Sequence, residues 1–202
     1  MIKVENEEVF GWEAAIRGMR NPMNSWDKSD SYWDETYHIG FEDLNLMESL
    51  SHAGTDHGKF LRMINVTMDV TAPLYWWKEF DTYKVGTVAN SCSTMHKIHE
   101  KEFTLDDFSH EHLNKSSLKP FNSLITELNV TRTLFLATKE KDYWWQMIQL
   151  LPSSYNQKRT IQLNYQVLKA IYAARRNHKL DEWREFCNWI LQLPYAKELI
   201  IN

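Results

Sequence analysis

The stretch that decides the fold runs from residue 71 to residue 96 and reads TAPLYWWKEFDTYKVGTVANSCSTMH. Thr71 can accept a hydrogen bond from an early helical amide, and Pro73 suits a first helical turn because its missing N–H would have no partner there. Apolar residues then recur at spacings of three and four, with charged residues largely between them: Leu74, Trp76, Trp77, Phe80 and Tyr83. The pattern predicts an amphipathic helix that opens at Pro73 and buries Trp77 and Phe80.

The helical pattern breaks at Gly86, and small polar side chains follow it. They are Thr87, Asn90, Ser91, Cys92, Ser93 and Thr94. A run of this kind does not form a core element. It is either an ordinary polar connection or a loop whose hydroxyl, amide and backbone groups bind a polar ligand.

The whole chain has 202 residues, a length that suits one domain, and we assign residues 1–202 to a single domain. With 43% hydrophobic residues and only 6 Gly and 5 Pro, the composition is that of a globular protein. The formal net charge of −4 argues against a nucleic-acid polymer as a partner, because such binding depends on clustered cations. Residues 158–179 nevertheless contain six cations and no Asp or Glu. This segment either holds a phosphate or decorates a helix.

The cysteine content and the hydropathy indicate the cellular compartment. Two cysteines, Cys92 and Cys187, are too few for a disulfide framework. No apolar stretch approaches the length of a membrane span, and the N-terminal region lacks the apolar core of a signal peptide. We therefore expect a cytoplasmic protein with no membrane partner.

Hydrophobic periodicity predicts the remaining elements. Apolar residues from Ile64 to Val70 alternate with polar ones, which predicts a strand over residues 60–70 that leads into Pro73. Residues 21–37 are rich in turn formers, which predicts a long loop, and long ordered loops in compact domains are often functional. The other expected elements are a strand at 2–4, a helix through Val9 and Ile16 that ends near Asn21-Pro22, a helix over 41–52 closed by Gly54, a partly helical segment over 101–119 with a helix start at Thr104, helices over 121–139 and 143–151, a strand at 160–163, helices over 165–176 and 180–193, and a short helix after Pro194.

Eight histidines raise the possibility of a metal site. The candidate ligand groups are Cys92 with His96 and His99, and His110 with His112. Neither group matches a firm zinc spacing. The pair Asp56-His57 has no matching partner motif and is more often a helix-capping turn than half of a metal or acid–base site. We therefore expect no metal.

The first of two informative blocks is the opening stretch itself. A strand leads into Ala72-Pro73, an aromatic helix follows, and Thr87, Asn90 and Ser93 come after it. This order resembles the central block of the flavin-dependent thymidylate synthases, in which an Ala-Pro opens a helix that leads to Arg-His-Arg and then to spaced Ser, Asn-Glu, Ser and Arg-Tyr. Thr87, Asn90 and Ser93 keep the family's pattern at the cost of one inserted residue.

The second block supports the resemblance independently. Asn164 lies twelve residues beyond Pro152 of a Leu-Pro pair, Arg175 lies eleven residues further on, and Trp183 follows on the next expected helix. The same family has Leu-Pro, Asn and Arg at these spacings, followed shortly by a Trp. The resemblance covers roughly residues 40–96 and 150–185 and leaves the middle of the chain unassigned.

Several charged residues of the family are replaced. Its Arg-His-Arg falls on Thr82-Tyr83-Lys84, its nucleotide-loop Glu and Arg fall on Ser91 and Met95, and two further arginines fall on Ile148 and Gln166. A neutral side chain does not substitute for an ion pair or a bidentate guanidinium. Either the ligands have changed, or other cations such as Arg62, Lys158 and Arg176 have taken over.

The resemblance implies an α/β (α+β) fold with a small sheet packed by helices, in a homo-oligomer taken as a homotetramer with active sites between subunits. It implies a methyltransferase that moves a one-carbon unit from methylenetetrahydrofolate to a pyrimidine deoxynucleoside monophosphate such as dUMP. Reduced FAD would donate hydride, and NADPH would reduce the flavin. The positions implied to bind substrate are Glu79, Ser91, Ser93, Arg175 and Arg176, and those implied to bind cofactor are Arg62, Tyr83, Lys84, Thr87, Asn90 and Asn164.

Two alternatives stay open from the sequence. The replaced cations favour a nucleotide-binding or structural homologue that has lost flavin chemistry. The histidines leave a metal-dependent hydrolase as a third reading. Within the leading one, Arg175 and Arg176 are rivals for the phosphate, because one residue inserted before Trp183 permits either.

Overall fold

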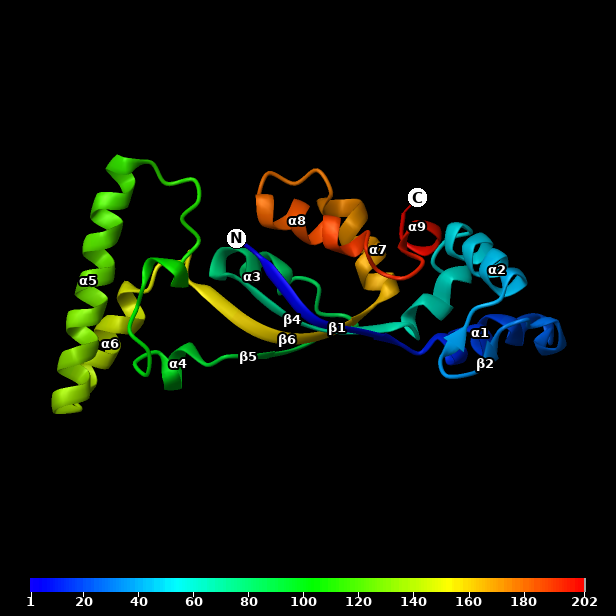
Figure 1. Ribbon diagram of the computed structural model, residues 1–202, viewed down its shortest axis with the longest axis horizontal. Helices are drawn as coiled ribbons and strands as arrows, with labels where there is room; N and C mark the ends of the chain where they lie inside the picture. The colour runs from blue at the N-terminus through cyan, green and yellow to red at the C-terminus, as the bar shows by residue number, and fades with distance from the viewer. Residues whose placement is uncertain (202) are drawn as a thin grey trace. The chain divides into compact units, whose positions relative to one another are not determined.

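The computed structural model describes residues 1–201 (Figure 1), and the chain divides into two compact units. Unit 1 comprises Met1–Lys3, Val70–Thr82 and Asn90–Arg159, and unit 2 comprises Val4–Asp69, Tyr83–Ala89 and the chain from Thr160 onward. Each of the four strands of the main sheet contributes residues to both units: β1 (Lys3–Phe10), β4 (Asn65–Pro73), β5 (Val88–Ser91) and β6 (Asn156–Asn164). The assignment of residues 1–202 to a single domain stays a prediction.

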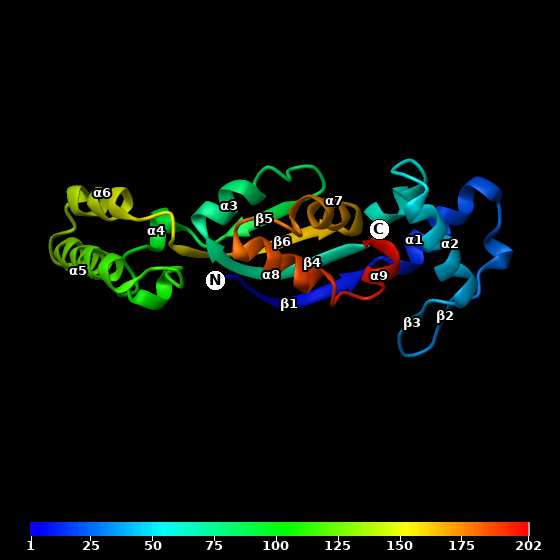
Figure 2. The same ribbon diagram turned by 90° about the horizontal axis from the view of Figure 1, so that it is seen from above.

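The helices and strands follow one another along the chain in a mixed order. They are β1 (Lys3–Phe10), α1 (Trp12–Arg20), η1 (Asn21–Met23), η2 (Trp26–Lys28), β2 (Tyr32–Trp33), β3 (Tyr37–His38), α2 (Phe41–His52), η3 (His57–Arg62), β4 (Asn65–Pro73), α3 (Leu74–Phe80), β5 (Val88–Ser91), α4 (Thr94–Lys97), η4 (Leu105–Asp107), α5 (Lys115–Thr138), α6 (Lys141–Leu150), β6 (Asn156–Asn164), α7 (Tyr165–Arg175), α8 (Asp181–Ile190) and α9 (Ala196–Leu199). The main sheet has the strand order β1-β4-β6-β5, which Figure 2 shows from above, and β2 pairs with β3 in a separate antiparallel hairpin.

Strand β4 confirms the alternating pattern, but it begins later than expected. Val66, Met68 and Val70 are buried and alternate with half-buried polar residues, as a strand with one face on the core requires. The expected start at residue 60 is wrong, because Phe60 and Leu61 lie in η3 and are both buried. Two adjacent buried side chains suit a helical turn, whereas a strand would point them to opposite faces.

Helix α3 buries the face that its periodicity predicted, although it begins and ends differently. Trp76, Trp77 and Phe80 are buried. Strand β4 continues through Pro73, and the amides of Leu74 and Tyr75 donate to carbonyls of the 153–155 turn at 3.0 Å, so Thr71 caps nothing. The helix ends at Phe80, and Tyr83 therefore lies in the following loop and not on the helix.

Two further expectations about local structure are wrong. The strand expected at residues 2–4 extends to Phe10, and the next helix begins only at Trp12, after Gly11 with a φ of 95°. A side chain at Gly11 would come within 2.1 Å of the Met63 carbonyl oxygen, so this junction requires glycine. The polar run after Gly86 forms strand β5 because backbone hydrogen bonding extends the sheet, although all its side chains are exposed.

Unit 1 has its own hydrophobic core around α5 and α6, which lie side by side in both views (Figures 1 and 2). The core residues are Ile98, Phe103, Phe108, Ile125, Leu128 and Met147. The expected start at Thr104 is confirmed as a capping box with Asp107 that opens η4. The central part of the chain, which the resemblance left unassigned, thus packs around α5 and α6.

In unit 2, helices α7 and α8 follow strand β6 and lie side by side (Figures 1 and 2). Asn164 ends β6 and caps α7, because its side-chain oxygen accepts a hydrogen bond from the Val167 amide at 3.1 Å. The amide of Tyr165 donates to the carbonyl of Ile64 at 3.0 Å. These bonds fix where α7 starts and therefore where its last residue, Arg175, lies.

Candidate functional site

The two sequence blocks meet around Arg175 in unit 2. The Arg175 Nε donates a hydrogen bond to the Tyr83 hydroxyl at 3.0 Å. Its guanidinium carbon lies 5.7 Å from the centre of the Tyr83 ring and 4.8 Å from that of Trp183. The two rings meet edge to face with centroids 6.0 Å apart. A planar guanidinium held against two aromatic rings has a restricted orientation, which suits binding of a phosphate or carboxylate.

The turn between α7 and α8 positions Trp183. The His178 amide donates to the carbonyl of Arg175 at 2.9 Å, and the His178 Nδ1 lies 3.2 Å from the Leu180 amide, which donates to it. The His178 ring also meets Trp183, with centroids 6.3 Å apart. Helix α8 then carries Trp183, fully buried, beneath the guanidinium. The segment from Arg175 to Trp183 is thus a single folded motif.

The thiol of Cys187 lies in the same region and is unreactive at neutral pH. Burial raises its pKa to about 11, and the positive charge of Arg175 offsets only part of that rise. A thiol with this pKa is almost entirely protonated at neutral pH, so it is a poor nucleophile. Cys187 is buried and behaves as an apolar residue.

Gly86 and Asn164 form a second contact between the two blocks. Gly86 has a φ of 79°, and a side chain on it would come within 2.9 Å of the Asn164 amide nitrogen. The Asn164 cap uses only the side-chain oxygen, so the amide nitrogen is a donor on the side of this loop. The neighbouring Thr87 hydroxyl is buried and has no hydrogen-bond partner within residues 1–201.

The other candidate cations of unit 2 are at the surface. Lys84 and Arg62 are exposed. Arg176 is also exposed, and its guanidinium carbon lies 5.8 Å above the Tyr172 ring. Only Arg175 of the two rivals is packed against both Tyr83 and Trp183.

The remaining candidates lie in unit 1. Asn90, Ser91 and Ser93 are exposed, and Glu79 is half-buried on α3. The Ser93 hydroxyl caps α4 by accepting from the His96 amide at 3.0 Å. The backbone between Ser91 and Ser93 is held at Cys92, whose amide donates to the Lys158 carbonyl at 2.9 Å and whose carbonyl accepts from Gln157 at 2.8 Å. This segment is an ordered polar surface with exposed side chains.

The structure thus brings Tyr83 to Arg175, and the Gly86–Thr87 turn to Asn164. It places Lys84, Arg62 and Arg176 outside the Arg175 contacts. Sequence reasoning left Trp183 and His178 out of the site, although the aromatic ring following the arginine at the family's spacing was the signal for Trp183. Nothing local in the sequence indicated the role of His178 in the turn.

Within residues 1–201, no group of three or more His, Cys, Asp or Glu side chains is placed to hold a metal ion. None of the helices in this part of the chain combines the length and apolar character needed to cross a membrane.

Solved structures with the same fold cover nearly the whole chain. Thymidylate synthase X from Helicobacter pylori, solved with FAD and dUMP, superimposes with a TM-score of 0.72 and 16% identity, over 99% of this chain and 97% of that one. A second structure of that enzyme, also with FAD and dUMP, gives the same score and identity over 98% and 97%. The UMP/dUMP methylase PolB from Streptomyces cacaoi, bound with 5-Br dUMP, gives 0.64 and 14% over 98% and 94%.

Comparison of sequences alone does not identify a relative of this chain. No family model and no curated protein matches the sequence. The fold class expected from the two blocks, a small sheet packed by helices as in the flavin-dependent thymidylate synthases, is nevertheless confirmed by the superpositions. The chain has the fold of the flavin-dependent thymidylate synthases.

Proposed function

We propose that this protein is an enzyme that binds a pyrimidine deoxynucleoside monophosphate such as dUMP and transfers a one-carbon unit to its base. The observation that carries the proposal is the meeting of the two motif blocks around Arg175, in a chain whose fold matches enzymes solved with dUMP over nearly its full length. The contact brings Tyr83 of the first block and Trp183 of the second against the same guanidinium, which supports a site at Arg175.

In this proposal Arg175 holds the nucleotide phosphate. Charge-assisted bonds from a guanidinium to phosphate are short and directional. Tyr83 and Trp183 restrict the guanidinium before the ligand arrives, so less conformational entropy is lost on binding. Arg176 is a second candidate for the phosphate. Glu79, Ser91 and Ser93, in unit 1, are proposed as further nucleotide-binding residues.

The donors in unit 2 also fit FAD. Flavin carbonyls and the pyrophosphate are acceptors, and Lys84, the Thr87 hydroxyl and the Asn164 amide nitrogen are donors that lie on or beside one short loop. We propose that these residues, with Arg62, Tyr83 and Asn90, hold the cofactor. When bound and reduced, FAD would supply hydride, with NADPH and methylenetetrahydrofolate as co-substrates.

The role left to the protein is positioning. In unit 2, Arg175 fixes the phosphate of the nucleotide. We propose separately that the segment of unit 1 around Ser91 and Ser93 binds nucleotide through polar contacts. Holding two reactants in a productive geometry converts a bimolecular step into an effectively unimolecular one. We further propose a homotetramer in which neighbouring subunits complete each site.

One observation favours a second candidate, a nucleotide-binding homologue without flavin chemistry. The Thr82 hydroxyl donates to the Glu79 carbonyl at 2.7 Å, and Tyr83 is engaged with Arg175. Thr82 and Tyr83, two of the three residues at the positions of the family's Arg-His-Arg, thus make hydrogen bonds within the protein itself. Adding FAD to the purified protein separates the candidates, because retained flavin absorbance after gel filtration supports the enzyme and its absence supports the homologue.

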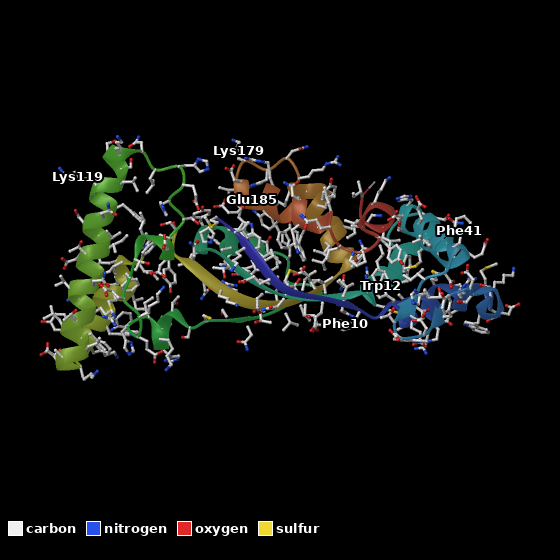
Figure 3. The ribbon with its side chains drawn as sticks, viewed as in Figure 1. Phe10, Trp12, Phe41, Lys119, Lys179 and Glu185 are labelled. Carbon is white, nitrogen blue, oxygen red and sulfur yellow. The ribbon has the colours of Figure 1, made fainter. Side chains whose placement is uncertain are left out.

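The phosphate role is tested by calorimetric titration of dUMP and deoxyuridine. Arg175→Ala should weaken dUMP binding by about tenfold to a hundredfold, which corresponds to roughly 1.5–3 kcal/mol for a charge-assisted bond. Deoxyuridine binding should barely change. Arg176→Ala decides between the rival arginines, and Lys179→Ala, in the loop between α7 and α8 (Figure 3), is the matched control for loss of one nearby cation. Equal losses for the two ligands, or a parent protein that binds neither, would refute the proposal.

A further inference from the structure

Unit 2 contains a cavity of about 590 Å³ at the junction between β1 and α1. Its lining consists of residues 9–14 and Arg17, together with Trp33 and residues 35–37 of the β2–β3 hairpin. The lining includes none of Tyr83, Arg175 and Trp183. The volume lies in the range of small-molecule sites, roughly 300–1,000 Å³.

Four aromatic rings line this cavity, and they belong to Phe10, Trp12, Trp33 and Tyr37. Phe10 and Trp12 flank Gly11 between β1 and α1 (Figure 3). Phe10 is 44% exposed and Trp33 is 63% exposed. Rings that line a cavity and keep much of their surface accessible offer their negative π faces to a ligand.

The hairpin holds two of these rings in place. Trp33 and Tyr37 are directly paired across the two strands, and their ring centroids are 5.2 Å apart. At the turn, the Asp34 carboxylate accepts from the Thr36 amide at 2.9 Å and lies 2.8 Å from the His38 Nε2. The rings are therefore positioned without a ligand, which lowers the entropy lost on binding.

The loop that leads into the hairpin is fixed by a buried carboxylate. Asp43, on α2, has none of its surface exposed. It accepts hydrogen bonds at 2.6 Å from the Ser29 hydroxyl, from the Ser31 hydroxyl and from the Arg20 Nε. These bonds join the loop to α1 and α2, so the strand that carries Trp33 starts from a fixed point.

The charges of the lining favour a cation. The Glu13 carboxylate is already matched, because it accepts from the Arg17 guanidinium at 3.2 Å and from the Trp33 Nε1 at 3.0 Å. Glu35 is exposed, and within residues 1–201 it forms no ion pair. The residues of β1 directly before Val9 add three more carboxylates, those of Glu5, Glu7 and Glu8. An anion in the cavity would be repelled by these groups.

We propose that this cavity binds a small organic cation, a quaternary ammonium or protonated alkylamine. Its charged group lies among the rings of Phe10, Trp33 and Tyr37 and beside the Glu35 carboxylate. A cation is attracted to the face of an aromatic ring, and a nearby carboxylate adds Coulomb attraction. The site does not depend on the proposed function, because it shares no residue with the contacts of Arg175.

The test is NMR titration of the full-length protein with choline and with its neutral carbon isostere, 3,3-dimethylbutanol. The two probes have the same shape, so a difference in affinity reports the effect of the charge. Choline should shift the indole N–H signal of Trp33 and bind about fivefold or more tightly than the isostere. Absence of choline binding, equal affinity for the two probes, or shifts confined to tryptophans outside the lining would overturn the proposal.

A carboxylate variant tests the charge. Glu35→Gln should weaken choline binding by about threefold and leave binding of the isostere unchanged. Glu185→Gln, at an exposed glutamate of α8 outside the lining (Figure 3), is the matched control and should change neither. Glu13 is left intact because it bonds to both Arg17 and Trp33.

A tryptophan variant tests the rings, with the indole signal of Trp12 as the readout. Trp33→Leu keeps an apolar side chain but should weaken choline binding by about fivefold or more. Trp26→Leu, at a tryptophan of the same unit that is 52% exposed and outside the lining, should have no effect. If neither Glu35→Gln nor Trp33→Leu weakens choline binding, choline binds elsewhere and the proposal fails.

Discussion

Replacement of Trp77 by alanine is expected to be among the most destabilising single changes in unit 1. Trp77 is 1% exposed on α3. Its Nε1 donates to the Gln157 carbonyl at 2.9 Å, and its ring centroid lies 4.8 Å from that of Trp76 and 5.3 Å from that of Phe80. The guanidinium carbon of Arg159 lies 4.2 Å from the ring centre. Truncation therefore removes packing, a hydrogen bond and a cation–π contact together.

The magnitude follows from these contacts. Large-to-alanine changes at buried aromatic positions cost about 3–5 kcal/mol. A carbonyl left without its donor in a buried position costs about 1–3 kcal/mol, and a partly desolvated cation–π contact is worth about 0.5–2 kcal/mol. Part of these contributions is already contained in the truncation value, so we expect Trp77→Ala to lower the free energy of unfolding by about 4–5 kcal/mol. Trp77→Phe keeps most of the ring and should cost about 1–2 kcal/mol.

The assay is urea denaturation followed by far-UV circular dichroism and by tryptophan fluorescence. Coincidence of the two transitions is required before a free energy is extracted, because the chain has two compact units. Trp145→Ala, at a tryptophan in the same unit that is 44% exposed, is the matched control and should cost about 1 kcal/mol or less. If Trp77→Ala is no more destabilising than Trp145→Ala, the assignment of the buried face and the contacts of α3 are wrong.

Three further predictions concern unit 2 and the two thiols. Burial opposes ionisation of Asp43, but hydrogen bonds from two serines and an arginine outweigh burial and lower its pKa below the ordinary value of 3.8. The stability that this carboxylate contributes is therefore present above pH 3.8 and is lost as the pH falls through the lowered pKa. Asp43→Asn should reduce the fall in melting temperature at acid pH, and an unchanged fall would contradict the argument. Under native conditions at mild alkaline pH, iodoacetamide should modify the exposed Cys92 and spare Cys187, whose pKa is raised to about 11, whereas mass spectrometry after denaturation should show both modified. Gly86→Ala should lower the free energy of unfolding by about 1–2 kcal/mol, because a φ of 79° is strained for alanine and the new methyl group would press on Asn164. If urea denaturation shows no change in stability, the loop relaxes freely and the argument from strain is wrong.

Much of the fold could be predicted from local sequence patterns. The alternation in β4 predicted which of its residues are buried, and the spacing in α3 predicted the burial of Trp77 and Phe80. These predictions succeed because a strand and a helix repeat their side-chain directions every 2 and about 3.6 residues, so the sequence alone records which face is apolar. Asn164 likewise carried a local signal, since an amide side chain before an apolar helix suits a cap.

The candidate site could be predicted only in part from the sequence. The spacing of Asn164, Arg175 and Trp183 indicated that these residues belong together, but it did not reveal that Tyr83 accepts a hydrogen bond from Arg175. That contact joins residues far apart in the chain. A polar partner at such a distance depends on how the elements pack, and no periodicity in either segment records it.

The sequence by itself determined the order and burial of the main elements and the resemblance that predicted the fold. Only the tertiary structure decided that the 153–155 turn, and not Thr71, satisfies the first amides of α3, and that Asp43 fixes the loop beside Arg20. The physical reason is that apolar burial is set by a repeating local pattern, whereas each buried polar group must find one specific partner. That partner is supplied by whichever distant segment the packing brings within hydrogen-bond distance.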